Sequence, residues 1–183
     1  MIDVGELLGA ELRGRTRGRK HYPILAEAFD ALPAGRVVEL DFENVQHVTA
    51  SWIVGALFPL YQHAAEPRVD AFPVICAVDR ELRDDFELVA EQTGQPYVDW
   101  CPRTKSNARL IGSLDTAERE TLAAVARAGT ATGADLAKSD GGVSATGWNN
   151  RLREVHRKRL LRRKTEGRRQ IYSIVFPELR TDG

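Results

Sequence analysis

The sequence has few cysteines and no long hydrophobic run. Its 183 residues include only two cysteines, Cys76 and Cys101, which do not form a C-x-x-C pair. Cys76 stands in the apolar segment 73–78, and this predicts a reduced, buried thiol. No stretch of about 18 apolar residues occurs, which argues against a membrane-spanning helix. The N-terminus lacks the basic start and apolar core of a signal peptide, so we expect a cytoplasmic protein with no membrane partner.

The motifs of common enzymes are also lacking. The four histidines are scattered along the chain: His21, His47, His63 and His156. Their spacing matches neither H-x-x-x-H nor H-E-x-x-H, and the G-x-S-x-G, Walker A and G-x-G-x-x-G loops are absent. A triad of Asp41, His47 and Ser51 has only proximity in sequence in its favour. We therefore expect no enzyme, no catalytic residue, no metal and no cofactor. The alternative is an enzyme with an unrecognised pocket in the N-terminal half.

Charge of one sign is not in excess overall, but the two ends of the chain differ. Residues 1–110 hold 12 Lys and Arg against 17 Asp and Glu, whereas residues 111–183 hold 14 against 9. The segment Arg151–Arg169 has ten basic residues, opposed only by Glu154 and Glu166. This asymmetry predicts two domains with different partners, of which the basic one faces a polyanion. A basic helix face that is merely solvated is the alternative.

The N-terminal half alternates short β-like runs with helical patterns. Strands are predicted at 37–42, 73–78 and 97–100, and helices at 22–32, from Ser51 onward, and from Asp79 onward with Asp79 as N-cap. Pro59 should kink or shorten the second helix, because its ring removes a donor. The run Arg13–Lys20 alternates cations with small residues and is expected to be a mobile loop or arm. Strands separated by helices predict an α/β layered sheet.

The last third of the chain changes to a helical pattern that ends in a basic hairpin. The predicted elements are a helix from Asp115 or Thr116 to near Gly129, a short helix over 132–138, a turn over 139–142, a helix with Ser144 as N-cap, and a hairpin with its turn at 165–167. This order is the winged helix-turn-helix arrangement. We therefore predict an α/β domain over 1–105, a linker over 106–113 and a winged-helix domain over 114–183, so that the whole chain is α/β, or α+β overall.

The third helix of this domain has one apolar stripe and one cationic face. On a helical wheel Trp148, Leu152 and Val155 form the buried stripe. The opposite face has side chains of the types that hydrogen-bond to base edges and phosphates. Among them, Asn150 could pair with adenine and Arg153 with guanine. The full set of predicted DNA-contacting residues is Thr146, Asn149, Asn150, Arg153, Arg157 and Lys158 in the helix, and Arg163, Lys164, Arg168 and Arg169 in the hairpin.

Residues 112–177 resemble the winged-helix regulators of the MarR and ArsR type. The resemblance is carried by Asp135–Ala137, by Asn150–Val155 and by the hairpin segment Leu160–Tyr172. It implies double-stranded DNA as the partner and control of transcription as the role. The long flanking helices that dimerise MarR relatives are missing here. We expect a homodimer whose interface lies elsewhere in the chain.

A second resemblance covers about residues 20–100. The segment Leu40–Trp52 is similar to the strand–loop–helix centre of STAS-like domains, relatives of the anti-sigma-factor antagonists. Asp41 matches the end of the strand. Thr49 stands where these antagonists have Asp, and Ser51 matches the second Ser of their phosphorylation motif. The resemblance implies dimerisation or a regulatory protein partner.

Three residues of this segment are candidates for the regulatory site: Thr49, Ser51 and Trp52. Ala50 replaces the first Ser of the motif and Trp52 replaces the usual Gly, so the phosphorylation motif is degraded. From the residues alone, Ser51 is either a helix N-cap or a phospho-acceptor. Trp52 is an interface anchor if it is exposed and a packing residue if it is buried.

The sequence as a whole therefore predicts a DNA-binding transcriptional regulator. The alternative is a protein-interaction regulator of the anti-sigma-antagonist type, in which the winged helix binds protein.

Overall fold

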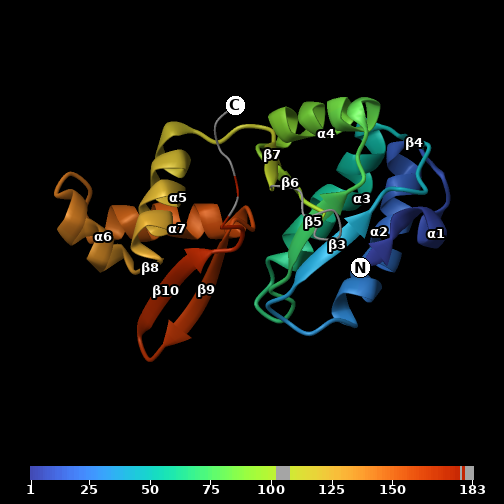
Figure 1. Ribbon diagram of the computed structural model, residues 1–183. Helices are drawn as coiled ribbons and strands as arrows, with labels where there is room; N and C mark the ends of the chain where they lie inside the picture. The colour runs from blue at the N-terminus through green and yellow to red at the C-terminus, as the bar shows by residue number, and fades with distance from the viewer. Residues whose placement is uncertain (102–107, 178, 180–183) are drawn as a thin grey trace. The chain divides into compact units, whose positions relative to one another are not determined.

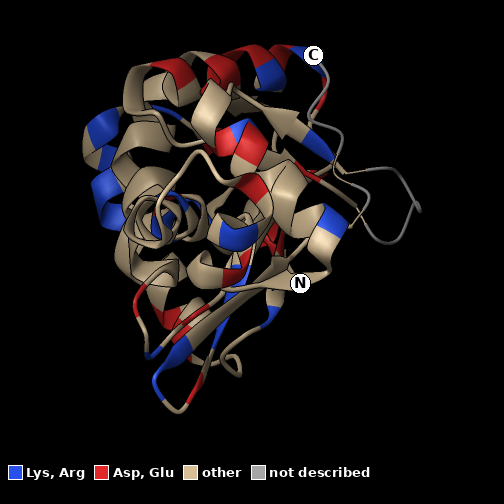
Figure 2. Ribbon diagram, turned by 90° about the vertical axis from the view of Figure 1, so that its left-hand side faces the viewer, with Lys and Arg blue, Asp and Glu red and all other residues tan. Residues whose placement is uncertain are grey.

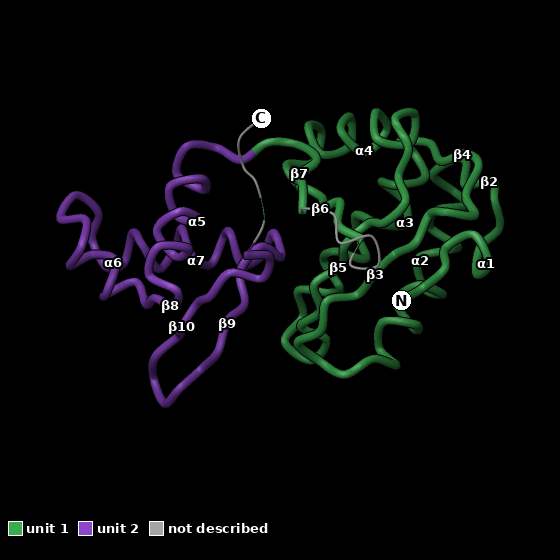
Figure 3. The backbone as a smooth tube through the Cα atoms, in the orientation of Figure 1, with its two compact units in different colours: residues 1–113, 178–183 green, residues 114–177 purple. Residues whose placement is uncertain are grey.

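The computed structural model describes residues 1–101, 108–177 and 179, and its fold is mixed α/β, as predicted (Figure 1). The chain divides into two compact units, residues 1–113 and residues 114–177 (Figure 3). In the described ranges, no helix has both the length and the apolar character needed to cross a membrane.

A five-stranded sheet organises the first unit, with strand order β1-β3-β5-β6-β7. Its strands are β1 (Ile2–Asp3), β3 (Val37–Asp41), β5 (Phe72–Cys76), β6 (Tyr97–Asp99) and β7 (Arg109–Ile111). All neighbours pair in parallel except β7, which runs antiparallel to β6. A separate parallel pair joins β2 (Glu11–Leu12) to β4 (His47–Val48).

Four helices belong to the first unit: α1 (Val4–Leu8), α2 (Arg15–Asp30), α3 (Ala50–Ala64) and α4 (Arg80–Thr93). The connections that contain α2, α3 and α4 each advance by one strand in the same direction across the parallel part of the sheet. Right-handed crossovers therefore place these three helices in one layer on the same face of the sheet, with α3 in the middle. The unit's core lies between this layer and the sheet, and includes Leu25, Leu40, Ile53, Ile75 and Phe86.

The helices α2 and α3 approach each other closely through two glycines. A Cβ atom added at Gly18 would lie 2.6 Å from the carbonyl oxygen of Trp52, and one added at Gly55 would lie 2.6 Å from the carbonyl oxygen of Arg15. This contact holds residues 15–20 as regular helix. The predicted mobile arm over Arg13–Lys20 is therefore wrong for all but its first two residues, because tertiary packing stabilises a segment whose own composition favours a loop.

The structure confirms some local predictions in this unit and corrects others. Asp79 is the N-cap of α4, where its carboxylate accepts a hydrogen bond from the Leu82 backbone N–H at 2.9 Å. Cys76 is buried, and its thiol donates to the Trp100 carbonyl at 2.9 Å. Pro59 does not shorten α3, which continues to Ala64.

The predicted linker needs correction as well. Residues 109–111, which lie within the predicted linker 106–113, form strand β7 and pair with β6. The predicted boundary of the first domain at residue 105 consequently leaves out one strand of its sheet. A three-residue strand is too short to show alternation in the sequence. Residues 102–107 lie outside the described residues.

The second unit contains α5 (Thr116–Ala128), β8 (Thr130–Ala131), α6 (Gly133–Asp140), α7 (Ala145–Arg157), β9 (Leu161–Glu166) and β10 (Arg169–Ile174). The three strands form an antiparallel sheet in the order β8-β10-β9. Strand β8 was not predicted, since two residues show no periodicity. Glu166 pairs with Arg169, so the hairpin turn is the two-residue loop Gly167–Arg168, slightly later than the predicted 165–167. Gly167 takes the left-handed conformation, with φ of 61°.

Caps set the helix starts of the second unit. Asp115 and Glu118 form a capping box at α5, and Ser144 accepts a hydrogen bond from the Gly147 N–H at 3.1 Å at the start of α7. Both starts agree with the prediction. The buried stripe of Trp148, Leu152 and Val155 is confirmed too, and packs α7 onto the core of the unit.

Candidate nucleic-acid interface

A groove runs between α6, α7 and the β9–β10 hairpin. Its volume is about 500 Å³. We call it the basic groove. The residues that line it are Thr132, Ala134, Asp135, Lys138, Asn149, Arg153, Arg168, Arg169 and Gln170. Figure 2 shows Lys and Arg positions on both arms of the hairpin. Three elements that are separate in the sequence thus contribute to one surface.

Four cations line the basic groove: Lys138 from α6, Arg153 from α7, and Arg168 and Arg169 from the hairpin. All four are exposed. Within the part of the chain that the structure describes, none of them has a carboxylate within ion-pair distance. Their mutual repulsion is therefore little offset by direct pairing, and the surface is suited to an anion that is shared among them.

Asp135 is the one acidic residue among those lining the groove. Its carboxylate accepts hydrogen bonds from the Thr132 hydroxyl at 2.7 Å and from the Thr132 backbone N–H at 3.1 Å. These bonds, together with nearby Lys138 and Arg169, lower the pKa of Asp135. The carboxylate is thus held as part of the α6 cap.

The groove brings together four of the ten residues predicted to contact DNA. They are Asn149, Arg153, Arg168 and Arg169. Asn149 packs where Gly133 leaves no Cβ, so that α6 can lie close to α7. Thr146 and Asn150 are exposed on α7 but do not line the groove. Lys138 and Gln170 were missed, because a single cation on a short helix and a polar residue in a strand give no pattern.

The other four predicted residues have neighbours that tie them to the protein or bury them. Arg157 pairs with Glu154, with Nε 3.2 Å from Oε2. Lys158 pairs with the buried Glu118 of α5. Lys164 pairs with Glu166 in the hairpin, with Nζ 2.7 Å from Oε1. Arg163 is half-buried in β9, opposite Tyr172.

Lys158 has a structural role that can be tested. The Lys158 and Glu118 side chains are only 12% and 8% exposed. Replacing Lys158 by Gln leaves the Glu118 carboxylate without this counter-ion, and we expect the free energy of unfolding of the second unit to fall by about 2 kcal/mol. Urea unfolding followed by circular dichroism measures this change. The matched control is Arg157→Gln, which breaks an exposed pair and should cost no more than about 0.5 kcal/mol. Equal losses for the two variants would rule out the structural role.

The regulatory candidates of the first unit lie at the start of α3. The N-cap is Thr49, whose hydroxyl oxygen accepts from the Trp52 backbone N–H at 3.4 Å. The N-cap interpretation of Ser51 is therefore wrong, because the helix begins one residue before it, at Ala50. Ser51 is exposed in the first turn, with its Oγ 3.1 Å from Thr49 Oγ1.

Trp52 is fully buried, with 0% of its surface exposed, so the interface-anchor interpretation is wrong. Its indole N–H donates to Nδ1 of His21 at 3.2 Å. Burial, and to a lesser degree Arg17, lower the pKa of His21, which favours the neutral ring that can accept this bond. Trp52 therefore ties α3 to α2.

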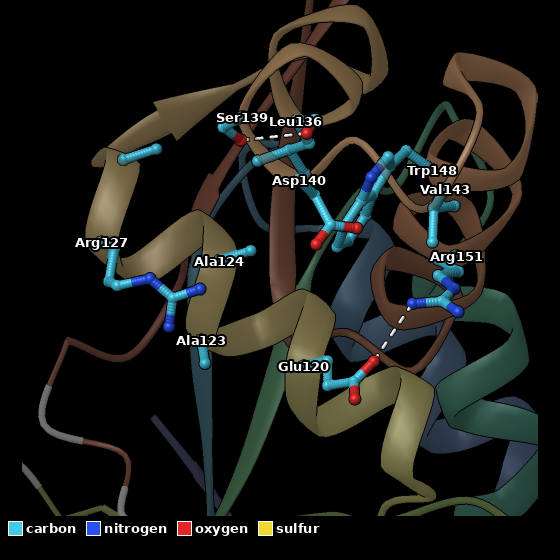
Figure 4. Close-up of a pocket in the computed structure, with 11 residues that line it drawn as sticks. Glu120, Ala123, Ala124, Arg127, Leu136, Ser139, Asp140, Val143, Trp148 and Arg151 are labelled. Carbon is cyan, nitrogen blue, oxygen red and sulfur yellow. Dashed lines mark hydrogen bonds and ion pairs between the residues drawn. The ribbon is translucent and has the colours of Figure 1, made fainter.

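A second hollow of about 670 Å³ lies between α5, α6 and α7 (Figure 4). Much of its lining is apolar, including Ala123, Ala124 and Trp148. Arg151 is held by Glu120, with Nη1 3.2 Å from Oε2, and lies 5.3 Å from the centre of the Trp148 ring. Ser139 donates its hydroxyl to the Leu136 carbonyl at 2.9 Å. These polar groups bind each other or the backbone, and they do not form a pair of nucleophile and base.

Among the described residues, no three His, Cys, Asp or Glu side chains are grouped as metal ligands would be. Comparisons with protein-family models, with curated proteins and with solved structures found no match to this chain.

Proposed function

We propose that the second unit is a winged helix-turn-helix that binds duplex DNA, in a cytoplasmic regulator of transcription. The observation that carries the proposal is the convergence of Lys138, Arg153, Arg168 and Arg169 on one groove, with no carboxylate within ion-pair distance of them among the described residues. Cations gathered on one surface are suited to the phosphates of a nucleic-acid backbone.

The order of elements supports a specific docking mode. In a winged helix-turn-helix the helix that precedes the hairpin enters the major groove, and its N-terminal part lies deepest. Here that helix is α7, and its first half presents the exposed polar side chains of Thr146, Asn149 and Asn150. These side chains are suited to base edges. Arg168 and Arg169, at the hairpin turn, would then contact the adjacent backbone or minor groove.

For the first unit we propose a STAS-like domain that supplies dimerisation or receives a signal. The parallel sheet with α2, α3 and α4 on one face supports this role, as does Asp41 at the carboxyl end of β3. A regulator of this kind needs two copies on DNA, because one winged helix buries too little surface for tight specific binding.

The proposal is tested by fluorescence anisotropy with a labelled random duplex, titrated with the full chain at several salt concentrations. If the four groove cations contact phosphates, log K should fall against log salt with a slope of about −3.5 for each bound copy. Absence of binding at about 50 mM salt would overturn the proposal, since electrostatic binding is strongest there. That outcome would favour a wing that docks on protein.

A further inference from the structure

The first half of α2 has an unbalanced basic surface. Arg15, Arg17, Arg19 and Lys20 are all exposed there. In the described ranges none of these four has a carboxylate within ion-pair distance. The helix has no acidic residue in its first turn, so the cations add to the positive end of its dipole. Such an arrangement is unfavourable for an isolated helix and favours an acidic partner.

The helix α4 has the opposite imbalance. Glu81, Asp84, Glu87 and Glu91 are exposed along it, and none has a cation within ion-pair distance in the part that is described. Its last turn has no basic residue, so Glu91 adds to the negative end of the dipole. In Figure 2 the Asp and Glu positions of α4 lie in red along the helix at the top.

Each charged surface adjoins an exposed apolar side chain. On α2, Ile24 is 42% exposed and lies on the same face as Lys20 and Arg17, which are four and seven residues before it. On α4, Leu88 is 45% exposed and lies on the same face as Asp84 and Glu91. The exposed Glu27 follows Ile24 by three residues, so the basic surface of α2 is confined to the N-terminal side of Ile24, whereas Leu88 has acidic residues on both sides.

Between these two helices lies α3, whose outer surface is partly apolar. Val54 and Phe58 are partly exposed there, one turn apart, and Ser51 and Gln62 extend the same face. The helical layer thus has one edge that is basic over the first half of α2, a partly apolar middle and an acidic edge along α4. Rotating a second copy of the layer by 180° about an axis that runs parallel to α3, along its outer surface, brings the basic edge of each copy opposite the acidic edge of the other.

We propose that this layer is the interface of a twofold dimer, in which α2 of each copy docks on α4 of the second copy and the two α3 helices meet at the axis. Both charge pairings form at once in this arrangement, and Ile24 lies against Leu88 of the second copy. A nucleic acid is a poorer occupant, because it would leave the acidic edge without a partner and would cover Ile24 with phosphates. The dimer does not depend on DNA binding by the second unit.

The test is sedimentation velocity on the full chain without DNA, over a wide range of protein concentrations. At about 50 mM salt we expect a dimer that dissociates with dilution, and a dissociation constant at least about tenfold higher at about 500 mM salt. A chain that stays monomeric at every concentration would overturn the proposal.

Two charge-reversed variants make the test specific. The first is Arg17→Glu with Lys20→Glu, and the second is Glu81→Lys with Asp84→Lys, which lie seven and four residues before Leu88 as Arg17 and Lys20 lie before Ile24. Each variant alone should be monomeric, because its two edges then have the same sign. An equimolar mixture of the two should form a heterodimer, and a chain with all four changes should dimerise with itself. Circular dichroism establishes that each variant is folded, as expected for exposed positions.

Arg36→Glu, an exposed change outside the helical layer, is the control and should leave the dimer intact. A mixture that stays monomeric while both variants are folded would refute the pairing of α2 with α4. If the α2 surface instead binds nucleic acid, the first variant would lose DNA affinity while the mixture showed no heterodimer.

Discussion

Replacing Arg153 and Arg169 together by Glu is expected to weaken binding of duplex DNA by about 100-fold or more at low salt. Arg153 belongs to α7 and Arg169 to the hairpin, and both line the basic groove. If DNA binds in the proposed way, each reversal removes a phosphate contact and adds a repulsive charge at the same place. Titration of a labelled random duplex by anisotropy measures the loss. Replacement of the same two residues by Ala should make the slope of log K against log salt concentration less negative by about 2.

A matched control separates the groove from total charge. Arg127 belongs to the second unit but lines the hollow next to α5 instead of the basic groove. Arg127→Glu changes the net charge by two units, as does either single reversal in the groove. We expect Arg127→Glu to change DNA affinity by less than about threefold, through screened long-range effects alone. An equal loss for Arg127→Glu and Arg153→Glu would mean that DNA does not use the groove.

Adding one methyl group at Gly18 or at Gly55 is expected to destabilise the first unit by about 3 kcal/mol. In an exposed helix position the change from Gly to Ala stabilises by about 1 kcal/mol. At Gly18 and Gly55 the same change is expected to destabilise, because the new Cβ at each site would lie 2.6 Å from a backbone carbonyl oxygen of the other helix. A backbone cannot rotate out of the way as a side chain can, so α2 and α3 must separate. Leu at either position should abolish cooperative folding of the unit.

Thermal and urea unfolding of the two Ala variants measure this effect. The control is Thr16→Ala, an exposed change in the same helix that should alter stability by no more than about 0.5 kcal/mol. If Gly18→Ala were as stable as the unchanged protein, the close contact of α2 with α3 would be wrong.

Features determined by neighbouring residues could be predicted from the sequence. Asp79, Asp115 and Ser144 each cap a helix by bonding to a backbone N–H three residues later, so the signal and its partner lie together. Features that depend on distant partners could not. The strand β7 exists because β6 offers it a partner, and α2 begins at Arg15 because Gly18 meets Gly55.

The same division applies to the candidate site. The apolar stripe of α7 predicts which way the helix faces, and this placed Arg153 on the outer surface. The pairing of Lys158 with Glu118 joins two distant segments, so a cation that looked available in the sequence is occupied. Trp52 was ambiguous for a related reason, since its burial depends on how α2 covers α3.

Two ion pairs fasten α7 and its C-cap residue to α5, one between Arg151 and Glu120 and the other between the C-cap Lys158 and Glu118. Because Arg151 and Lys158 are seven residues apart, the two pairs hold the helix at two places, and it cannot easily roll about its own axis. The orientation that a duplex would meet is therefore preorganised before any encounter. Less rotational freedom would then be lost on association, so more of the contact energy would remain as affinity.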